Sequence, residues 1–418
     1  MEKLKKFNTK EEYQEWKDSD DYSYPNVCKV ADEIVYNDYP EPFWIEALED
    51  IRVWQGFIEG SSANGGSSSD PHSSYWKKSE TYMTYSSDKV NWTSLTKDYS
   101  SWAIIKTGEK LYFQSTYKPT TSYNNIGTFY ITGKCNIGGS ILSLIHGADY
   151  LTERSTFPEG YVFSGLFRAG HLGVEYNKII NAKDLILPEY TTYSCYSGLF
   201  RGCKDLLTAP RLPAKTVASQ CYMNMFVDCV SLTKAPSLLA LAHKGEYTYG
   251  SMFSGCSSLS YIKMMSLSPL SGGTYGSNTG WVKGVSPTGI YIANYKGGLS
   301  AYRGDDYIPE GWNVYLYDED NDRYVVKFSV NSIPYEYYTD EPKDITWNEF
   351  INSEYNTNGF TAQQEDGATA KTIKFGDNYV LLSGNKVLIT DKVILNASYT
   401  IGQPTATTEL TETTNEEE

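Results

Sequence analysis

One phrase of about 26 residues recurs in the middle of this chain. It reads CYSGLFRGCKDLLTAPRLPA at 195–214, CYMNMFVDCVSLTKAPSLLA at 221–240 and YGSMFSGCSSLSYIK at 249–263. Its phenylalanines, Phe200, Phe226 and Phe253, follow one another at intervals of 26 and 27 residues. A fixed period of this length predicts a solenoid, in which each coil buries its apolar face only against neighbouring coils. Such a fold favours a surface for display and binding over a catalytic pocket.

An incomplete copy of the phrase, YVFSGLFRAG at 161–170, precedes the three full ones. It has Gly170 where the later copies have Cys, and the 33 residues from Phe167 to Phe200 imply an insertion. The sequence therefore predicts about three and a half coils, close to the minimum of about three for a stable solenoid. We expect the preceding β-rich segment and the strand-rich segment after the repeats to cap the two ends.

The composition fits a β-rich binding protein better than a helical enzyme. The chain has 418 residues, with 37 Tyr against 15 Phe and plentiful Gly, Ser, Thr and Asn. This mixture is typical of β-structure and of tyrosine-rich contact surfaces. The net charge of −15 argues against binding to nucleic acid and favours a surface that resists self-association. We predict a fold that is mainly β with some α.

The predicted domain organisation has five parts. The first, residues 1–40, is an N-terminal anchoring or docking segment. It has a short helix at 10–19 behind a Thr9–Glu12 capping box and two short strands in VCKVADEIVYN. The others are a β-sandwich-like domain at 41–160, the repeats with a C-terminal cap at 161–315, a small α+β module at 316–402 and an acidic tail at 403–418.

Alternation of apolar and polar residues predicts the strands of these domains. In the sandwich they are ETYMTYSS, VNWTSLT, WAIIKTG, KLYFQST and GTFYITGKCNI. In the α+β module, DRYVVKFSV and PYEYYT predict a hairpin pair, and TIKFG, NYVLLSG and KVLITDKVIL predict further strands. Thr346 and Glu349 form a second capping box, which predicts a helix over 347–355. We do not expect the acidic tail to fold alone.

The chain shows no apolar stretch of signal-peptide length at its N-terminus and none of membrane-spanning length elsewhere. We therefore expect neither standard secretion nor membrane insertion.

Five of the seven cysteines fall at repeat positions, namely Cys195, Cys203, Cys221, Cys229 and Cys256. An odd number without CxxC spacing argues against a disulfide framework or a zinc site. We interpret these residues as small buried hydrophobic spacers between coils. The alternative is a bridge between Cys203 and Cys229, which adjacent coils would bring close.

No catalytic, cofactor-binding or metal-binding residue is predicted. The chain lacks the common nucleophile, phosphate-loop and metalloprotease motifs, and its four histidines share no motif spacing. Asp318, Asp320 and Asp322 alternate as in a calcium loop, but Arg323 stands where that loop needs Gly. A β-turn between Tyr317 and Tyr324 explains them better.

Five tyrosines of the repeats form the candidate ligand-contact surface. Two alternatives remain open for them. They line the core, or they face outwards as an aromatic strip suited to sugar or protein contact. The five, which share nearly the same phase of the repeat, are Tyr193, Tyr196, Tyr222, Tyr247 and Tyr249.

The repeated phrase at 195–263 resembles the BspA-like leucine-rich repeats, whose pattern is CY–x–x–MF–x–GC–x–SL–x–x–AP–x–LPA. The resemblance extends over about residues 45–315, through GEKLYFQS upstream and GWVKGVSPTGIYIAN downstream. Such modules occur in surface adhesins of gut and oral bacteria and in virion proteins of phages that infect gut bacteria. The chain departs from the pattern at Val227-Asp228, where x-Gly is usual, and at EYTYGSMF in the third copy.

Two flanking segments favour the phage. KKFNTKEEYQEWKDSDDYSYPNVCKVADEIVYND is similar to an N-terminal segment of virion and fibre-like proteins, including those of the crAss-like group. ITWNEFINSEYNTNGF is similar to a C-terminal module of phage structural proteins.

The resemblance implies a non-enzymatic head fibre, tail fibre or decoration subunit on the virion surface, assembled in the host cytoplasm. Its expected partners are capsid or tail proteins, further copies of itself and a host glycan or surface protein. The alternatives are a bacterial cell-surface adhesin and a glycan-cleaving fibre enzyme.

Overall fold

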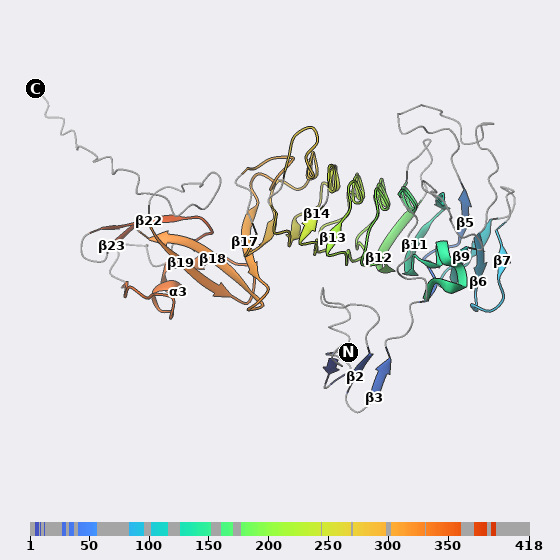
Figure 1. Cartoon of the computed structure of the whole chain (residues 1–418), viewed down its shortest axis with the longest axis horizontal. Coiled ribbons are helices and arrows are strands. Elements are labelled where there is room, and N and C mark those ends of the chain that lie inside the picture. The colour runs from blue at the N-terminus through green and yellow to red at the C-terminus, as the bar shows by residue number, and fades with distance from the viewer. Residues whose placement is uncertain are drawn as a thin grey trace, which may run out of the picture. The chain divides into compact units, whose positions relative to one another are not determined.

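The fold is mainly β, as predicted, and the residues that the structure describes include only a few short helices. The chain divides into two compact units, Met1–Val314 and Tyr315–Glu418, which are described separately. Figure 1 shows the elements along the chain. The computed structural model describes residues 5–7, 9, 12, 27–30, 33–36, 41–56, 83–95, 102–115, 126–151, 160–169, 177–243, 245–268, 271–297, 302–330, 332–360, 372–382 and 386–389.

The N-terminal segment contains a small three-stranded sheet. Strand β2 (Val27–Val30) pairs antiparallel with β3 (Glu33–Tyr36), which confirms the two strands predicted in this segment. Strand β1 (Lys5–Phe7) pairs in parallel with β2. The backbone N–H of Glu12 donates to Thr9 Oγ1 at 3.1 Å, which is one half of the predicted capping box. The rest of the helix predicted at 10–19 lies outside the described residues.

Two sheets form the domain that precedes the repeats. The five predicted sandwich strands are all present and provide β6 to β11. The three-stranded sheet has the order β10-β5-β8, and the six-stranded sheet has the order β12-β11-β4-β9-β6-β7. The strands are β4 (Trp44–Ala47), β5 (Ile51–Gly56), β6 (Met83–Ser86), β7 (Thr93–Ser94), β8 (Ala103–Ile105), β9 (Lys110–Ser115), β10 (Thr128–Ile131), β11 (Lys134–Ser140) and β12 (Lys178–Ile186).

Aromatic rings join these two sheets. The ring of Phe129, on β10, lies 5.6 Å from that of Phe113 on β9 and 5.4 Å from that of Phe43, next to β4. All three side chains are fully buried. A short helix, α2 (Ser143–His146), and a 3₁₀ turn, η1 (Gly147–Leu151), follow β11. The core of this domain is therefore a phenylalanine cluster between the sheets.

The domain and the repeats are continuous in structure. Strand β12 lies after the first coil in sequence, yet it pairs in parallel with β11 of the six-stranded sheet. Asn177, just before β12, is buried and donates through Nδ2 to the carbonyls of Phe129 (2.7 Å) and Arg168 (3.0 Å). Its Oδ1 accepts from the N–H of Ile131 at 3.0 Å. The sheet thus extends beyond residue 160, where the sequence placed the domain boundary.

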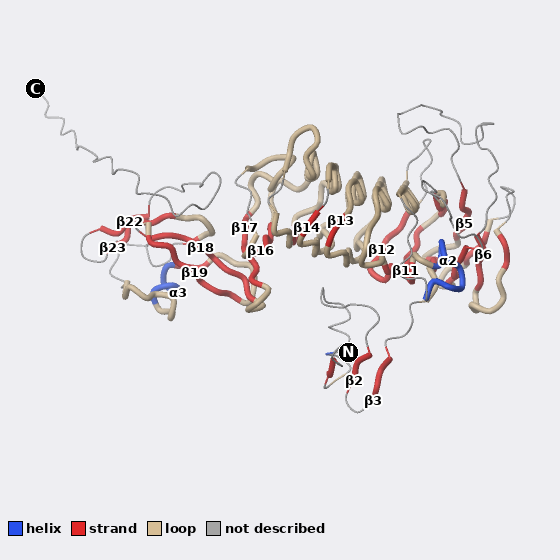
Figure 2. Tube along the Cα trace, viewed as in Figure 1, coloured by secondary structure: helices blue, strands red, loops and turns tan. Residues whose placement is uncertain are grey.

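Each coil of the solenoid has a tight-turn side and a strand side. Figure 2 shows the turns as stacked tan loops beside the short red strands β13 and β14. The strand side consists of β12 and of short segments that pair in parallel between coils, with isolated bridges such as Leu212 to Leu238. These segments are β13 (Thr216–Val217), β14 (Ala242–His243), β15 (Tyr261–Met264) and β16 (Ile290–Asn294).

On the turn side, successive backbone N–H groups donate alternately to the next coil and to their own coil. In the coil at 221–229, the N–H groups of Tyr222, Asn224 and Phe226 donate to carbonyls of the next coil at 2.8–3.0 Å. The N–H groups of the residues between them donate instead to the carbonyl three residues back in the same coil. Buried backbone groups must find partners, and this pattern provides one for each N–H.

The alternation requires a left-handed residue at every fourth position. Such backbone favours Gly and tolerates Asn and Asp. Gly202 and Gly255 hold one of these positions with φ of 81° and 79°, and Asp228 holds it with φ of 60° in the coil between them. Asp228, which departs from the repeat pattern, is therefore one of the few other residue types that this backbone tolerates.

The repeated phenylalanines form a continuous stack inside the solenoid. Phe167 and Phe200 lie 5.5 Å apart, and Phe226 and Phe253 lie 5.6 Å apart with 5° between the ring planes. The next ring is that of Trp281, 6.1 Å from Phe253. The turn at 275–285 is thus a further coil, and the solenoid is longer than the sequence predicted. Trp281 holds the backbone position of Met252 in the preceding coil, and its ring ends the stack.

The C-terminal unit is a small α+β fold around the helix α3 (Trp347–Ile351). Strand β17 (Asn313–Asp318) begins two residues before this unit and continues into it. The other strands of the unit are β18 (Arg323–Val330), β19 (Ile333–Thr339), β20 (Ile345–Thr346), β21 (Thr372–Ile373), β22 (Asn378–Leu382) and β23 (Lys386–Ile389). The predicted hairpin is β18 with β19, which pair antiparallel along their whole length. Strand β22 pairs with β18 in parallel and with β23 antiparallel. The strand predicted to continue after Ile389, and the acidic tail, lie outside the described residues.

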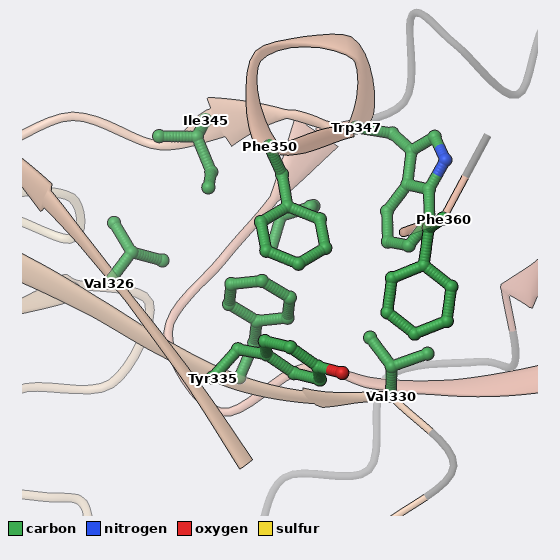
Figure 3. Close-up of a cluster of buried hydrophobic side chains, with 9 residues drawn as sticks. Val326, Val330, Tyr335, Ile345, Trp347, Phe350 and Phe360 are labelled. Atoms are coloured by element: carbon green, nitrogen blue, oxygen red, sulfur yellow. The ribbon is translucent and has the colours of Figure 1, made fainter. Parts of the chain in front are cut away.

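An aromatic cluster is the core of this unit. In Figure 3 the ring of Phe350 points from α3 towards Tyr335 on β19. These two rings are 5.2 Å apart, and Phe350 lies 4.9 Å from Phe328 on β18. Trp347 and Phe360 complete the ring contacts. The helix therefore covers one face of the sheet, and the two share an apolar core.

The capping box at the start of α3 is confirmed. Thr346 Oγ1 accepts from the N–H of Glu349 at 3.2 Å, and Glu349 Oε2 accepts from the N–H of Thr346 at 2.6 Å. The helix ends at Ile351, four residues earlier than predicted. Beyond it, Asn352 Nδ2 donates to the carbonyl of Asn348 and Asn356 Nδ2 to that of Ile351. The N–H of Asn352 also donates to the carbonyl of Asn348, so asparagine side chains supplement the last backbone bonds where α3 ends.

Candidate binding surface

Three of the five candidate tyrosines are core residues. Tyr196, Tyr222 and Tyr249 are at most 2% exposed. Tyr196 and Tyr222 stack with their ring centres 6.2 Å apart, and Tyr222 and Tyr249 with 6.0 Å. Burial raises the pKa of all three phenols well above the ordinary value. They form a second aromatic stack beside the phenylalanines and present no surface to a ligand.

The other two candidates, Tyr193 and Tyr247, lie at the surface, and each has a tyrosine partner in an adjacent coil. Tyr193 is 39% exposed and meets Tyr161 edge to face at 5.4 Å between ring centres. Tyr247 meets Tyr275 in the same manner at 6.3 Å, and Tyr275 is 67% exposed. We call these four residues the tyrosine edge.

The two pairs occupy equivalent places in the solenoid. Tyr161 and Tyr247 have left-handed backbone, with φ of 51° and 52°, and their N–H groups donate to Tyr193 and Gly276 of the following coils. A bulky residue in this conformation is an outlier that costs on the order of 1–2 kcal/mol. The turn of each coil imposes this conformation, since Ser194 and Gln220 hold the same place in the intervening coils with φ of 52° and 57°.

Between the two pairs the edge is polar. Ser194 Oγ donates to Gln220 Oε1 at 3.3 Å, and Ser219 Oγ donates to the carbonyl of Glu246 at 3.0 Å. Coils two apart are separated by about 10 Å, because neighbouring strands lie about 4.8 Å apart. The edge therefore offers two aromatic faces with hydrogen-bonding groups between them, an arrangement that suits extended polar ligands such as saccharides.

Sequence reasoning missed Tyr161 and Tyr275. Tyr161 is the first residue of the incomplete copy already identified at 161–170. Tyr275 could have been found by extending the repeat by one coil, because it follows Tyr247 at nearly the period of the phrase. Conversely, Tyr193 and Tyr196 are only three residues apart, yet one is exposed and the other is buried. The position within the repeat, judged to within a few residues, does not predict which of the two tyrosines is exposed.

The repeat cysteines are buried and unbridged. Cys203, Cys229 and Cys256 each donate their thiol to the carbonyl of a phenylalanine in the preceding coil, at 2.9–3.2 Å. The Cys203–Cys229 bridge considered as an alternative is therefore not formed. The sulfur atoms that meet are those of Cys195 and Cys221, 3.0 Å apart in successive coils.

The acidic triplet forms the predicted β-turn. Tyr317 pairs with Tyr324 across the hairpin of β17 and β18. Asp318 accepts from the N–H of Asp320 and from Asn321 Nδ2, which closes the turn. Over the part of the chain that the structure describes, no group of three or more His, Cys, Asp or Glu is arranged to hold a metal ion. Nor does any helix there have the length and apolarity to cross a membrane.

Comparison with known proteins gives no further information about this surface. No family model matches the chain, and no curated protein or solved structure matches it either.

Proposed function

We propose that this chain is a non-enzymatic subunit of a phage particle, a head fibre, tail fibre or decoration protein, whose solenoid binds the host surface through the tyrosine edge. The observation that carries the binding role is the pair of tyrosine contacts, Tyr161 with Tyr193 and Tyr247 with Tyr275, at equivalent places on the solenoid. The phage assignment is supported by the flanking segments of the sequence.

The edge is suited to recognition because it is already ordered. Its backbone is fixed by hydrogen bonds between coils, and each ring rests on a second ring. Tyrosine provides a large contact area with only two side-chain torsions to fix. Little conformational entropy is therefore lost when a ligand binds, which is the general advantage of a preorganised surface.

One copy of the edge has too small an area for tight binding. Four tyrosines fall far below the 20–30 residues per partner of a stable protein interface. Binding therefore depends on many copies on one particle, which convert weak contacts into strong attachment. A host glycan with repeated units is the ligand class that fits both the polar aromatic edge and this multivalent use.

Binding to host cells tests the role of the edge. The double variant Tyr193→Ala with Tyr275→Ala is expected to reduce attachment of multimerised protein by at least about tenfold, since each lost stacking contact is worth about 1 kcal/mol and the loss multiplies over copies. Tyr302→Ala is the matched control, because Tyr302 is 62% exposed but lies outside the edge. Equal attachment of the double variant and the unchanged protein would reject the edge as the binding surface.

Proteomics of purified particles tests the assignment to a phage. We expect peptides of this chain in particles at a constant ratio to the major capsid protein. Absence from particles together with presence on bacterial cells would replace the proposal by a bacterial adhesin. Release of reducing sugars from host capsule by the purified chain would replace it by a glycan-cleaving enzyme.

A further inference from the structure

Two arginines lie next to each other in successive coils of the solenoid. Arg168 and Arg201 follow Phe167 and Phe200, whose rings stack at 5.5 Å. The N–H of Ala169 donates to the carbonyl of Arg201 at 2.7 Å, which holds the two positions in register. Backbones paired in this way lie about 4.8 Å apart. The two arginine side chains therefore extend from equivalent backbone positions in neighbouring coils.

The backbone at both arginines is held firmly. The N–H of Arg168 donates to Gly165 and that of Arg201 donates to Gly198, each at 3.1 Å. The carbonyl of Arg168 accepts from the buried Asn177 side chain at 3.0 Å. Only the side chains themselves remain to be ordered when a ligand binds, so the cost of binding is low.

No acidic partner balances these charges among the residues that the structure describes. Some other cations do have such partners, as Arg323 has in Asp340 at 3.1 Å and Lys89 in Glu41 at 2.9 Å. For the guanidinium groups of Arg168 and Arg201, neither a hydrogen bond nor an ion pair is found over the same described ranges. Two adjacent positive charges are therefore left without an acidic partner among the described residues of a chain whose net charge is −15.

The electrostatic environment favours an added anion. Both side chains are half-buried. Burial lowers the pKa of Arg168, and the neighbouring positive charge of Arg201 lowers it further, whereas the Tyr130 hydroxyl acts in the opposite direction. Like charges held together in a partly desolvated place repel each other, and an anion between them would relieve that repulsion.

The arrangement is specific to the first two coils. Beside each arginine stands a glycine, Gly165 or Gly198, and the nearest atom that a Cβ there would meet is the arginine Cβ at 3.9 Å. In the next coil the corresponding positions carry Asn224 and Val227, so both the open space and the charge are absent there. The coil at 275–285 again has a glycine and a cation at these positions, Gly280 and Lys283, but the coil before it has Ser251 and Ser254. Among the described coils, cations beside glycines at two adjacent levels therefore occur only at Arg168 and Arg201.

We propose that Arg168 and Arg201 form a binding site for one oxyanion group. Guanidinium groups recognise carboxylate, sulfate and phosphate oxygens through paired hydrogen bonds, and two at adjacent levels can hold one such group from two sides. The group can come from an acidic sugar or from a sulfate or phosphate ester. The site includes none of the four residues of the tyrosine edge, so an experiment that rejects one proposal does not reject the other.

Calorimetric titration of the full chain tests the proposal. Sodium glucuronate, sulfate and phosphate are added in parallel, each against sodium chloride at equal ionic strength. We expect saturable binding of at least one anion, weakened at least tenfold in Arg168→Gln and in Arg201→Gln. Binding of glucuronate alone would identify a carboxylate ligand, and binding of sulfate or phosphate alone would identify an ester. No binding beyond that of chloride would overturn the proposal.

Two further variants sharpen the result. Arg52→Gln is the matched control, because Arg52 is exposed on β5, and an equal loss of binding there would overturn the site. Glu175 lies outside the described residues, close in sequence to Arg168. If it already neutralised the pair, Glu175→Gln would bind the anion and the unchanged chain would not, which would also overturn the proposal.

Thermal unfolding separates binding from a structural role. Without added anion, Arg201→Gln should unfold at the same temperature as the unchanged chain or higher, because a repulsion has been removed. Addition of the bound anion should raise the unfolding temperature of the unchanged chain more than that of the variant. A lower unfolding temperature of Arg201→Gln in chloride alone would indicate a structural residue and contradict the site.

Discussion

The rings of Phe200 and Phe226 are parallel to within 1° at a distance of 5.6 Å, although they are 26 residues apart in sequence. This stacking continues through Phe253 and links every coil to its neighbours. We expect Phe226→Ala to destabilise the first unit by about 3–5 kcal/mol, because it removes a fully buried ring between two others. Denaturant unfolding measures the change.

Leu207→Ala is the control for this prediction, because Leu207 is in the same solenoid but 56% exposed. Its effect should stay within about 0.5 kcal/mol. Similar losses for the two variants would contradict a stability that depends on the internal stack.

Asp228 and Gly255 form a coupled pair in successive coils. A Cβ on Gly255 would lie 2.2 Å from Asp228 Oδ1, and the φ of 79° disfavours any side chain there. Gly255→Ala should therefore cost at least about 2 kcal/mol, from left-handed strain and from the clash. In an Asp228→Gly background only the strain remains, so a double-mutant cycle should show coupling of about 1 kcal/mol. Additive effects would disprove the contact.

Oxidation distinguishes the two possible cysteine pairs. The thiols of Cys195 and Cys221 meet at 3.0 Å, whereas those of Cys203 and Cys229 donate to separate carbonyls. Treatment with a disulfide reagent should yield the Cys195–Cys221 bridge, detected by peptide mass spectrometry without reduction. The reaction should be slow, because burial raises the pKa of Cys221 and suppresses its thiolate. Cys195→Ser removes the product, and a Cys203–Cys229 bridge in its place would refute the assignment.

The capping box of α3 makes the second unit sensitive to acid. The N–H of Thr346 donates to the Glu349 carboxylate and lowers its pKa in the folded state. This contribution is present above the pKa of the unfolded chain and is lost as the pH falls through the lowered folded value. Glu349→Gln should flatten the fall in unfolding temperature below pH 5 or so, near the ordinary Glu pKa of about 4.3. An unchanged acid slope would show that the pair contributes nothing.

Thr346→Ala provides an independent measure of the same cap. It removes the acceptor for the Glu349 N–H and should cost about 1 kcal/mol at neutral pH. Thr357→Ala serves as the control, because Thr357 is exposed in the turn after α3.

Several parts of the fold could be predicted from local sequence. The Thr346–Glu349 box acts over one helical turn, and the hairpin around Asp318 is closed by groups within four residues. The interval between Phe200 and Phe226 is visible in the sequence because each coil buries the same type of residue at the same position. In each case the interacting groups are close in sequence or are repeated at a fixed step, so a pattern in one dimension contains the information.

Other parts depended on contacts that no local pattern contains. Strand β12 joins a sheet formed before the first coil, and the left-handed turns follow a four-residue alternation rather than the period of a helix or strand. In such backbone the direction of a side chain is set by the coil stacked against it. This is why Tyr196 is buried and Tyr193 is exposed.

The sequence by itself therefore determined that the chain stacks repeated coils around phenylalanine. Only the tertiary structure decided which tyrosines form the tyrosine edge, which cysteines meet and where Arg168 and Arg201 come together. The physical reason is that the core repeats with the period of the sequence, whereas the surface is formed by neighbouring coils whose register depends on the whole stack.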